Sequence, residues 1–427
     1  MSRTGPTPRP DPARTVALDV LAAVLGRPPR QLEDAFARLA DRAGLAGRDR
    51  AFARRLVATV LRRKGQLDGA LAGYLRYAPD ALAAQNLLRL GAAQILLLET
   101  PPHAAVATTV ALARARKRPE AGLINAVLRK LAAERPELPD VTRNLPAWLW
   151  RRWGATYGED VARAVAAAQA EEPPLDLTVP RERAAWAARL GGTALGPQTV
   201  RLDRPGPIEE LAGYAEGAWW VQDVAATLPV ASLGDLAGRR VLDAGAAPGG
   251  KTAQLIHAGG DVTALDADAA RMTRLEANLA RLGLTATTRI GHLEDVAEDG
   301  FDVVLVDAPC TATGTLRRHP DIPWHRSERD VCTQAALQAR LLEAALARLK
   351  PGGRLVYASC SLEPEEGEAL LAGWCAGRDD VTPVPAVADP PAELGVLRRG
   401  EGAWRTLPAA IPGGMDGFFF AHLTKRG

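Results

Sequence analysis

Two cysteines follow apolar stretches in the second half of the chain, where a nucleophile could be presented to a ligand. Cys310 comes directly after FDVVLVDAP, and Cys360 comes directly after GGRLVYAS. Asp307 lies just before Cys310 in the first of these stretches. A thiolate is a strong nucleophile, and a nearby carboxylate can hold or move a proton. These residue types therefore suit covalent catalysis.

A glycine-rich turn is the second feature that could do chemistry. The stretch LDAGAAPGGKT (242–252) lies between an apolar run and a helical run, and its backbone can approach a ligand closely. The residues that could line such a ligand are Gly245, Ala246, Ala247, Pro248, Gly249, Gly250 and Lys251. Taken literally, Gly245 to Thr252 matches the phosphate-binding loop of nucleoside triphosphate hydrolases. A hydrolase of this kind is one interpretation of the turn.

Three features favour a nucleoside ligand over a triphosphate. Asp243 precedes the turn, where its negative charge would oppose phosphate groups. Asp266 ends the next apolar stretch, VTALDAD, and an acidic group there suits the two hydroxyls of a ribose. Phosphoryl transfer also has no need of cysteines at the later strand ends. Magnesium-dependent hydrolysis that requires Lys251 would restore the hydrolase interpretation.

The elements that must position these residues alternate between strand and helix from residue 231 onward. Apolar strand-like stretches such as RRVLDAG and DVTALDAD are separated by helical stretches such as DAARMTRLEANLARLG. This alternation predicts an α/β fold, Rossmann-like, with a mostly parallel sheet wrapped by helices. In such sheets ligands bind at the carboxyl ends of the strands, and each polar cluster described above falls at such an end.

The first part of the chain has a different pattern. Residues 13–134 repeat apolar side chains at intervals of three and four residues, which predicts a compact all-helical bundle. Residues 135–230 mix helical and strand-like stretches, which predicts a small α+β subdomain. We therefore expect three domains, at 1–140, 141–230 and 231–427.

Charge is distributed unevenly between these regions. Residues 1–140 contain 23 Lys and Arg against 13 Asp and Glu, a net charge of +10, whereas residues 141–427 have a net charge of −7. A basic module suggests a polyanionic partner such as RNA, although arginines could also simply keep alanine- and leucine-rich helices soluble.

The chain has no apolar run long enough to span a membrane and no signal peptide, so we expect no membrane partner. Its four cysteines lack the paired spacing of a disulfide framework or a zinc site. We therefore expect a cytoplasmic protein without a metal. Cys332 and Cys375 lie in helical stretches, where a structural role is expected.

The combined motifs resemble the RNA 5-methylcytosine methyltransferases, which use S-adenosylmethionine. The resemblance rests on DAGAAPGGKT, on VDAPCTATGTLRRHPDIPW and on YASCSLEPEEGE, together with the closing segment MDGFFFAHLTK. The helical region resembles the antitermination factor NusB, and WWVQDVAATL is similar to the segment that bridges the two regions in the family. The resemblance covers nearly the whole chain. It implies a NusB-like RNA-binding domain, a connecting subdomain and a methyltransferase domain.

The resemblance also implies roles for the residues. Carbon 5 of cytosine becomes nucleophilic only after a thiolate adds to carbon 6. By resemblance Cys360 is this nucleophile, Cys310 assists release of the product, and Asp307 meets both the ring and the donor; by the chemistry alone, Cys310 remains a rival nucleophile. Lys251 could polarise the site or be only a cation at the start of a helix.

The donor is expected to lie across Gly245 to Lys251, with Asp266 on the ribose and Asp307 and His292 beside it. The chain departs from the family at two of these positions: the family usually has Cys in place of Gly245 and Asp in place of His292. A neutral imidazole accepts one hydrogen bond but lacks the carboxylate charge, so Glu294 or Asp295 could substitute.

The expected partner is small-subunit ribosomal RNA, as naked RNA or in an early assembly intermediate, and we expect the enzyme to act as a monomer. The segment TLRRHPDIPWHR (315–326) combines Arg317, Arg318 and Arg326 with Trp324, which predicts contact with RNA phosphates and an unpaired base. The departures at the donor turn leave an alternative function, an RNA-binding ribosome-assembly factor whose methyltransferase domain is impaired.

Overall fold

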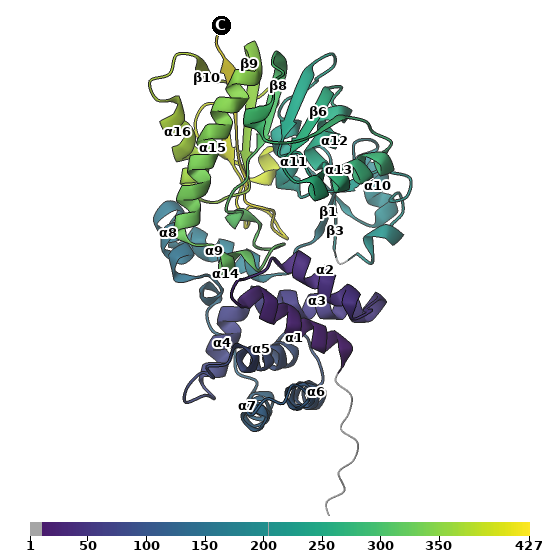
Figure 1. The fold of residues 1–427 in the computed structure, drawn as a ribbon, viewed down its shortest axis with the longest axis vertical. Helices are drawn as coiled ribbons and strands as arrows, with labels where there is room; N and C mark the ends of the chain where they lie inside the picture. Colours follow the sequence, from purple (N-terminus) through teal and green to yellow (C-terminus); the bar gives the residue numbers. More distant parts are fainter. Residues whose placement is uncertain (1–10, 204) are drawn as a thin grey trace, which may run out of the picture. The chain divides into compact units, whose positions relative to one another are not determined.

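The computed structural model describes residues 11–203 and 205–427, which form two compact units (Figure 1). The first unit combines residues up to Glu171 with the later segment Leu316–His325. The second unit contains the described residues of 172–315 together with 326–427. A short segment from the second half of the chain is therefore part of the helical unit.

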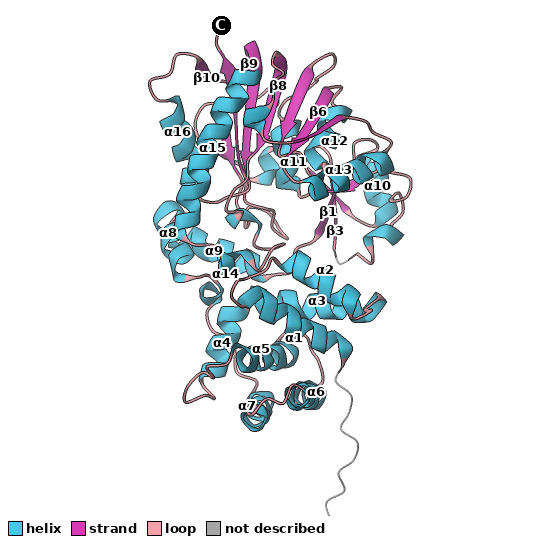
Figure 2. Cartoon of the chain, in the orientation of Figure 1, coloured by secondary structure: helices cyan, strands magenta, loops and turns pink. Residues whose placement is uncertain are grey.

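In the part of the first unit that the structure describes, the regular elements are all helices, which confirms the predicted bundle (Figure 2). Apolar side chains on one face of each helix, among them Leu21, Leu56 and Leu87, are fully buried in a common core. Its helices are α1 (Pro12–Leu25), α2 (Leu32–Arg42), α3 (Gly47–Arg62), α4 (Lys64–Ala72), α5 (Leu82–Leu96), α6 (Pro102–Ala115), α7 (Ala121–Glu134), α8 (Ala147–Tyr157), α9 (Glu159–Ala170) and α14 (Ile322–His325), with the 3-10 turn η1 (Val141–Asn144).

The second unit begins with a small antiparallel sheet, as predicted for a connecting α+β region. Its strands lie in the order β2 (Thr193–Leu195), β3 (Thr199–Leu202), β1 (Leu175–Thr178) and β4 (Trp220–Val221). Helix α10 (Arg183–Leu190) packs beside it, and Leu177, Val200 and Trp219 form its buried core. The sheet is followed by α11 (Val224–Ala231), which begins at the N-cap Asp223.

A larger mixed sheet forms the body of the second unit. Its parallel part has the order β9, β8, β5, β6, β7, and the strands β11, β12, β13 and β10 extend it in antiparallel fashion beyond β9. The strands are β5 (Arg240–Ala244), β6 (Asp261–Asp266), β7 (Thr287–Ile290), β8 (Phe301–Asp307), β9 (Leu349–Ser359), β10 (Val381–Pro383), β11 (Leu397–Arg398), β12 (Ala403–Arg405) and β13 (Phe419–Lys425).

Helices cover both faces of this sheet, which explains why its central strands are apolar throughout. On one face Val304 of β8 packs with Leu342 of α15 (Glu328–Arg348), and α16 (Glu368–Cys375) joins the same cluster (Figure 1). On the other face Leu305 packs with Leu255 of α12 (Gly250–His257) and with the end of α11. Helix α13 (Ala269–Leu282) covers β6 and β7.

The strand order reverses at β5, because β6 and β7 lie on one side of it while β8 and β9 lie on the other. In an open parallel sheet this reversal leaves a crevice at the carboxyl ends of the strands, where ligands bind. The glycine turn, Asp266, Asp307 and the two candidate cysteines all follow the carboxyl ends of these strands. Within the described ranges, no helix combines the length and apolar character that a bilayer crossing requires.

Candidate active site

The turn after β5 is shaped by a glycine that approaches the neighbouring strand. Gly245 has φ +80°, and a Cβ atom there would lie 2.4 Å from the carbonyl oxygen of Asp307. The amides of Gly245 and Ala246 both donate to Leu265 O on β6, at 2.9 and 3.0 Å. The turn is therefore held between β6 and β8, and its backbone lies where the strand order of the sheet reverses.

Asp266 lies directly beside this turn, as its position at a strand end predicts. Its Oδ2 accepts from the amide of Ala247 at 3.2 Å, and its Oδ1 accepts from the amide of Asp268 at 3.0 Å. The guanidinium of Arg271 lies 3.5 Å from Oδ2. The carboxylate is only 4% exposed, so its orientation is set by the turn that it supports.

His292 follows β7, and the backbone next to it is hydrogen-bonded to Asp266. The amide of Gly291, the preceding residue, donates to Asp266 O at 3.1 Å. The His292 side chain is exposed, and so are Glu294 and Asp295 in the 3-10 turn that follows. The structure thus brings His292 to the edge of the turn beside Asp266.

Lys251 and Asp307 form an ion pair at the carboxyl ends of the strands. Lys251 Nζ lies 2.7 Å from Asp307 Oδ2 and 5.1 Å from the centre of the Phe418 ring. Burial alone would lower the pKa of Lys251, but the adjacent Asp307 carboxylate outweighs it and the net pKa is raised. Lys251 therefore carries a positive charge at the active-site rim.

Asp243 is a functional candidate that the sequence analysis did not single out as a site residue. Its side chain is completely buried, and its Oδ2 accepts from the Thr252 hydroxyl at 2.6 Å. Burial raises the pKa of Asp243 to about 7, and the negative charges of Asp307 and Asp266 add to this effect, whereas the Thr252 hydrogen bond and Lys251 oppose it. Its position at the end of a strand, directly before the glycine turn, is the sequence feature that could have identified Asp243 as a site residue.

The same contacts argue against a phosphate loop. In such loops the lysine reaches the β- and γ-phosphates and the following hydroxyl binds Mg²⁺. Here the lysine is paired with Asp307, and the hydroxyl of Thr252 donates to a buried carboxylate. Although Gly245 to Thr252 matches the phosphate-binding motif in sequence, the contacts of Lys251 and Thr252 differ from those in a nucleoside triphosphate hydrolase.

The two candidate cysteines meet at neighbouring strand ends. The register of β8 and β9 pairs Asp307 with Ala358, and the amide of Ala308 donates to Ala358 O at 2.9 Å. The chain then turns so that Cys310 Sγ and Cys360 Sγ lie 3.3 Å apart. Both are free cysteines and both are half-buried. The structure thus brings together the two thiols that the sequence pattern singled out.

Cys360 is held as a thiol in this arrangement. The hydrogen bond with Cys310 and burial raise its pKa well above the usual range, and the Asp307 carboxylate adds to the rise. The charge of Lys251 acts in the opposite direction. Cys375 at the end of α16 packs against the sheet core, in line with the structural role expected for it. Cys332 on α15 is exposed, so its side chain does not have the buried structural position expected from the sequence.

The segment predicted to contact RNA has a different environment. Arg317 is 1% exposed, and Trp324 packs against the core of the helical unit with its Nε1 donating to Leu61 O at 3.1 Å. The burial of Arg317 contradicts its predicted contact with RNA phosphates. Trp324 is partly exposed, so its contact with an unpaired base stays a prediction. Arg318 and Arg326 are half-exposed.

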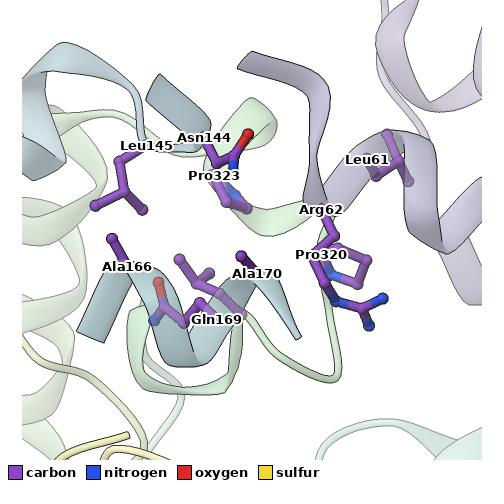
Figure 3. Close-up of a pocket in the computed structure, with 10 residues that line it drawn as sticks. Leu61, Arg62, Asn144, Leu145, Ala166, Gln169, Ala170, Pro320 and Pro323 are labelled. Carbon is purple, nitrogen blue, oxygen red and sulfur yellow. The ribbon is translucent and has the colours of Figure 1, made fainter. Parts of the chain in front are cut away.

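The packing of this segment also forms a small pocket within the helical unit (Figure 3). Pro320 lies beside Arg62 of α3, and Ala166, Gln169 and Ala170 of α9 line another side of the pocket. None of the residues that line this pocket belongs to the predicted donor or cysteine site. We regard it as a consequence of the packing between the segment and the bundle.

Comparisons with known proteins agree with this geometry. Residues 231–424 match the family described as 16S rRNA methyltransferase RsmB/F, and residues 11–133 match the NusB family. Ribosomal RNA small subunit methyltransferase B of Salmonella arizonae is 37% identical over 409 residues, covering 90% of this chain and 92% of that protein. The chain belongs to the ribosomal RNA small subunit methyltransferase B family. The Xanthomonas campestris member is 39% identical, with 88% of this chain and 89% of that protein covered.

A solved structure supports the fold of the methyltransferase region. The crystal structure of a methyltransferase homolog protein from Pyrococcus horikoshii is 30% identical and has a TM-score of 0.55, covering 64% of this chain and 93% of that chain. Membership of the methyltransferase B family confirms the resemblance inferred from the motifs, and with it the expected enzyme class. The family uses S-adenosylmethionine as its methyl donor.

Proposed function

We propose that this chain methylates carbon 5 of a cytosine in small-subunit ribosomal RNA. The observation that carries the proposal is the pair of thiols 3.3 Å apart, next to a Lys251–Asp307 ion pair at the strand reversal. Two cysteines are required where one sulfur adds to the base and the other assists product release. Family membership supports the RNA substrate, because the curated relatives are ribosomal RNA methyltransferases by name.

The residues of the glycine turn fit S-adenosylmethionine. The absence of a side chain at Gly245 lets the turn approach the Asp307 carbonyl closely, and the buried carboxylate of Asp266 accepts from the amide of Ala247 in the same turn. We propose that Gly245 to Lys251 contact the donor, with Asp266 on its ribose and with Asp307 and His292 at its edges. When bound, the donor supplies an electrophilic methyl group on a sulfonium.

The chemistry of this chain's own residues can be written with its protons balanced. Cys360 Sγ forms a bond to carbon 6 of cytosine, and the thiol proton passes by way of Asp307 to ring nitrogen 3. Carbon 5 is then electron-rich. Lys251 stabilises Asp307 whenever that carboxylate is charged, and it lowers the cost of forming the thiolate.

Release of the methylated base reverses the addition. Cys310 first gives its own thiol proton to solvent and then, as a thiolate, takes the proton from carbon 5. The sulfur–carbon 6 bond breaks with its electron pair returning to Cys360. Ring nitrogen 3 gives back its proton as the double bond between carbons 5 and 6 re-forms. The position of Cys310, in contact with the Cys360 sulfur, suits a group that acts on the same ring.

Each domain has its own proposed function. We propose that residues 1–140 bind RNA and that residues 231–427 carry out methyl transfer. Residues 141–230 connect these two domains. The target base must leave its stack to reach half-buried thiols, so the structure of the surrounding RNA is part of recognition. We further propose that the enzyme acts as a monomer, in the cytoplasm, on naked RNA or an early assembly intermediate.

Methylation of defined RNA tests this function directly. The purified full-length chain is incubated with methyl-labelled S-adenosylmethionine and small-subunit ribosomal RNA, either naked or in partly assembled particles. Bisulfite sequencing should locate 5-methylcytosine at a discrete site, and Cys360→Ala should remove it without changing the unfolding transition. Absence of methylcytosine on both substrates would contradict the proposal.

A second function is favoured by two specific residues. By the resemblance drawn from the sequence motifs, Gly245 in the glycine turn and His292 after β7 replace the Cys and Asp usual in the family, which would fit a ribosome-assembly factor with an impaired methyltransferase domain. Equilibrium dialysis with S-adenosylmethionine separates the two functions. Saturable binding supports the enzyme, whereas RNA binding without donor binding supports the assembly factor.

A further inference from the structure

A buried glutamate contacts the loops that carry both cysteines. Glu366 lies in the 3-10 turn η5 (Pro364–Glu366) after β9, and its side chain is completely buried. Its Oε1 accepts from the amide of Thr311 at 2.8 Å. Its Oε2 accepts from the Ser361 hydroxyl at 2.5 Å and also from the Thr311 hydroxyl. The Nε2 of Gln338 on α15 donates to Oε1 at 3.1 Å.

The partners of Glu366 are the immediate neighbours of the two thiols. Thr311 follows Cys310 in the chain, and Ser361 follows Cys360. The two hydroxyls lie 3.1 Å apart and share one carboxylate oxygen. Because each hydroxyl is one residue from a sulfur, the carboxylate fixes the separation of the loops at the point where the thiols meet.

Further bonds join the same two loops and leave little freedom around this point. The amide of Gly314 donates to Cys360 O at 3.0 Å, and the amide of Leu362 donates to Thr313 Oγ1 at 3.0 Å. Arg405, also fully buried, donates to Ser361 O at 2.7 Å. The hydroxyl of Tyr357 donates to the carbonyl oxygen of Glu366 at 2.9 Å, which orients the turn itself.

The carboxylate group is chemically suited to this task. Burial raises the pKa of Glu366, while hydrogen bonds from Ser361 and Thr311 act in the opposite direction. An ionised carboxylate only accepts, so it can take all four donors at once. An amide at the same position would present two N–H donors on one side, and these cannot accept from the Thr311 and Ser361 hydroxyls.

We propose that Glu366 is a positioning residue that holds the Cys310 and Cys360 loops at the separation required for attack and release. This inference rests on the roles proposed above for the two cysteines. The hydrogen bonds of the Glu366 carboxylate described above do not reach either sulfur. Glu366 therefore acts on the thiols through Thr311 and Ser361. Its loss should therefore change the relative placement of the thiols while the sheet beneath them stays folded.

Oxidation of the resting protein measures that placement without RNA or donor. The background variant is Cys332→Ser with Cys375→Ala, which leaves only the two active-site thiols. Diamide oxidises these to a disulfide and is itself reduced to the hydrazine, and mass spectrometry counts the two hydrogens lost. The rate should be high in the parent and at least about tenfold lower in Glu366→Gln, because misplacement lowers the effective concentration of one thiol at the other.

Kinetics on RNA provide the second readout. Glu366→Gln should lower kcat by up to about 100-fold with little change in the dissociation constant for RNA, because a displacement near 1 Å has an effect of that size. Thr311→Val and Ser361→Ala each remove one hydroxyl donor and should show smaller losses. Glu401→Gln, at an exposed glutamate between β11 and β12, is the matched control and should leave both rates unchanged.

Two outcomes would overturn the proposal. If Glu366→Gln keeps a normal urea transition and both rates stay within about twofold of the parent, the glutamate does not position the thiols. If Glu366→Gln fails to fold, Thr311→Val is measured instead, because it keeps the Glu366 carboxylate. An oxidation rate and a kcat of Thr311→Val within about twofold of the parent would then overturn the proposal. The oxidation assay needs no substrate, so a failure of the proposed methylation would be distinguished from a failure of this inference.

Discussion

The contact with Cys310 changes the acidity of Cys360 in the resting protein. Their hydrogen bond is the largest cause of the raised pKa of Cys360, ahead of burial. A cytosine that enters between the two sulfurs would break this bond and leave Lys251 as the nearby opposing charge. We therefore expect substrate entry itself to favour the thiolate, so that the nucleophile is formed only when its target is present.

Replacement of Cys310 tests the division of roles between the thiols. We expect Cys310→Ala to form the bond between Cys360 and carbon 6 but to release the product slowly, because the group that assists release is missing. A protein–RNA adduct should accumulate and appear as a slow band on a denaturing gel. A variant that turns over at the parental rate without an adduct would remove the proposed role of Cys310.

The buried acid Asp243 makes stability depend on pH. Its pKa is raised to about 7 in the folded protein from its ordinary value of 3.8, so the folded state retains a proton that the unfolded state releases. Between these values the unfolded state binds fewer protons, and the free energy of unfolding must fall as pH rises. The loss is complete above the folded pKa.

Urea unfolding of Asp243→Asn against the parent measures this effect. The parent should lose stability between pH 5 and pH 8 relative to the variant, since the neutral amide has no proton to lose. Thr252→Val removes the hydrogen bond that favours the charged form, so it should raise the pKa of Asp243 in the folded protein further and extend the fall to higher pH. Parallel pH profiles for the parent and Asp243→Asn would show that this carboxyl does not titrate in the range.

At the scale of elements, the segment 316–325 completes the helical unit. Asp321 Oδ2 accepts from the amide of Leu32 at 3.0 Å, at the start of α2, whose own N-cap Gln31 makes no side-chain cap. The ammonium of Lys64 lies 4.4 Å from the centre of the Trp324 ring. A helix start and part of the bundle core thus depend on residues that are almost 300 positions away.

Substitution of Trp324 tests this dependence. Trp324→Ala should destabilise the full chain by about 2 kcal/mol, less than a fully buried tryptophan because the ring is partly exposed. Trp324→Phe keeps the packing and loses the hydrogen bond to Leu61 O, so its cost should be near 1 kcal/mol. Equal unfolding midpoints for Trp324→Ala and the parent would show that the segment does not stabilise the bundle.

These elements also show what the sequence could predict and what it could not. The strand ends at Asp266 and Asp307 follow from local patterns, because apolar runs and a glycine turn identify each strand and its carboxyl end. Glu366 could not be found in this way. It lies in the acidic run EPEEGE, which is typical of a solvent-exposed turn, and its partner Thr311 is 55 residues away.

The packing of Trp324 could not be predicted for the same physical reason. An arginine- and tryptophan-rich loop near a reactive cysteine predicts an RNA contact, and only the tertiary structure shows that the indole N–H of Trp324 donates to Leu61 O on α3. Short-range periodicity identifies elements and their ends, whereas the partner of a polar or aromatic side chain depends on long-range contacts.

At the scale of the whole molecule, the uneven charge distribution predicts how RNA affinity responds to salt. The excess positive charge lies in residues 1–140, and Arg114, Lys117 and Arg129 at α6 and α7 are exposed. A truncation at residue 140 would cut into the helical unit, which continues to Glu171. Surface substitutions in the full chain are therefore the cleaner test.

Changing these three cations to Gln should weaken RNA binding and flatten its salt dependence. Each lost phosphate contact in single-stranded RNA should reduce the slope of log K against log salt by about 0.7. The control changes the exposed Arg274, Arg340 and Arg398 of the second unit to Gln, which removes the same charge. An equal fall in slope for both triple variants would show that the helical unit has no special role in RNA binding.

The central claim is a transient bond between Cys360 and a cytosine, and RNA carrying 5-fluorocytidine at the target position tests it most directly. Fluorine cannot leave carbon 5 as a proton does, so the adduct formed with the parent enzyme and S-adenosylmethionine should persist. Peptide mapping of the adduct should place the nucleotide on Cys360. A nucleotide attached to Cys310, or methylation of ordinary RNA with no adduct to either sulfur, would contradict the account.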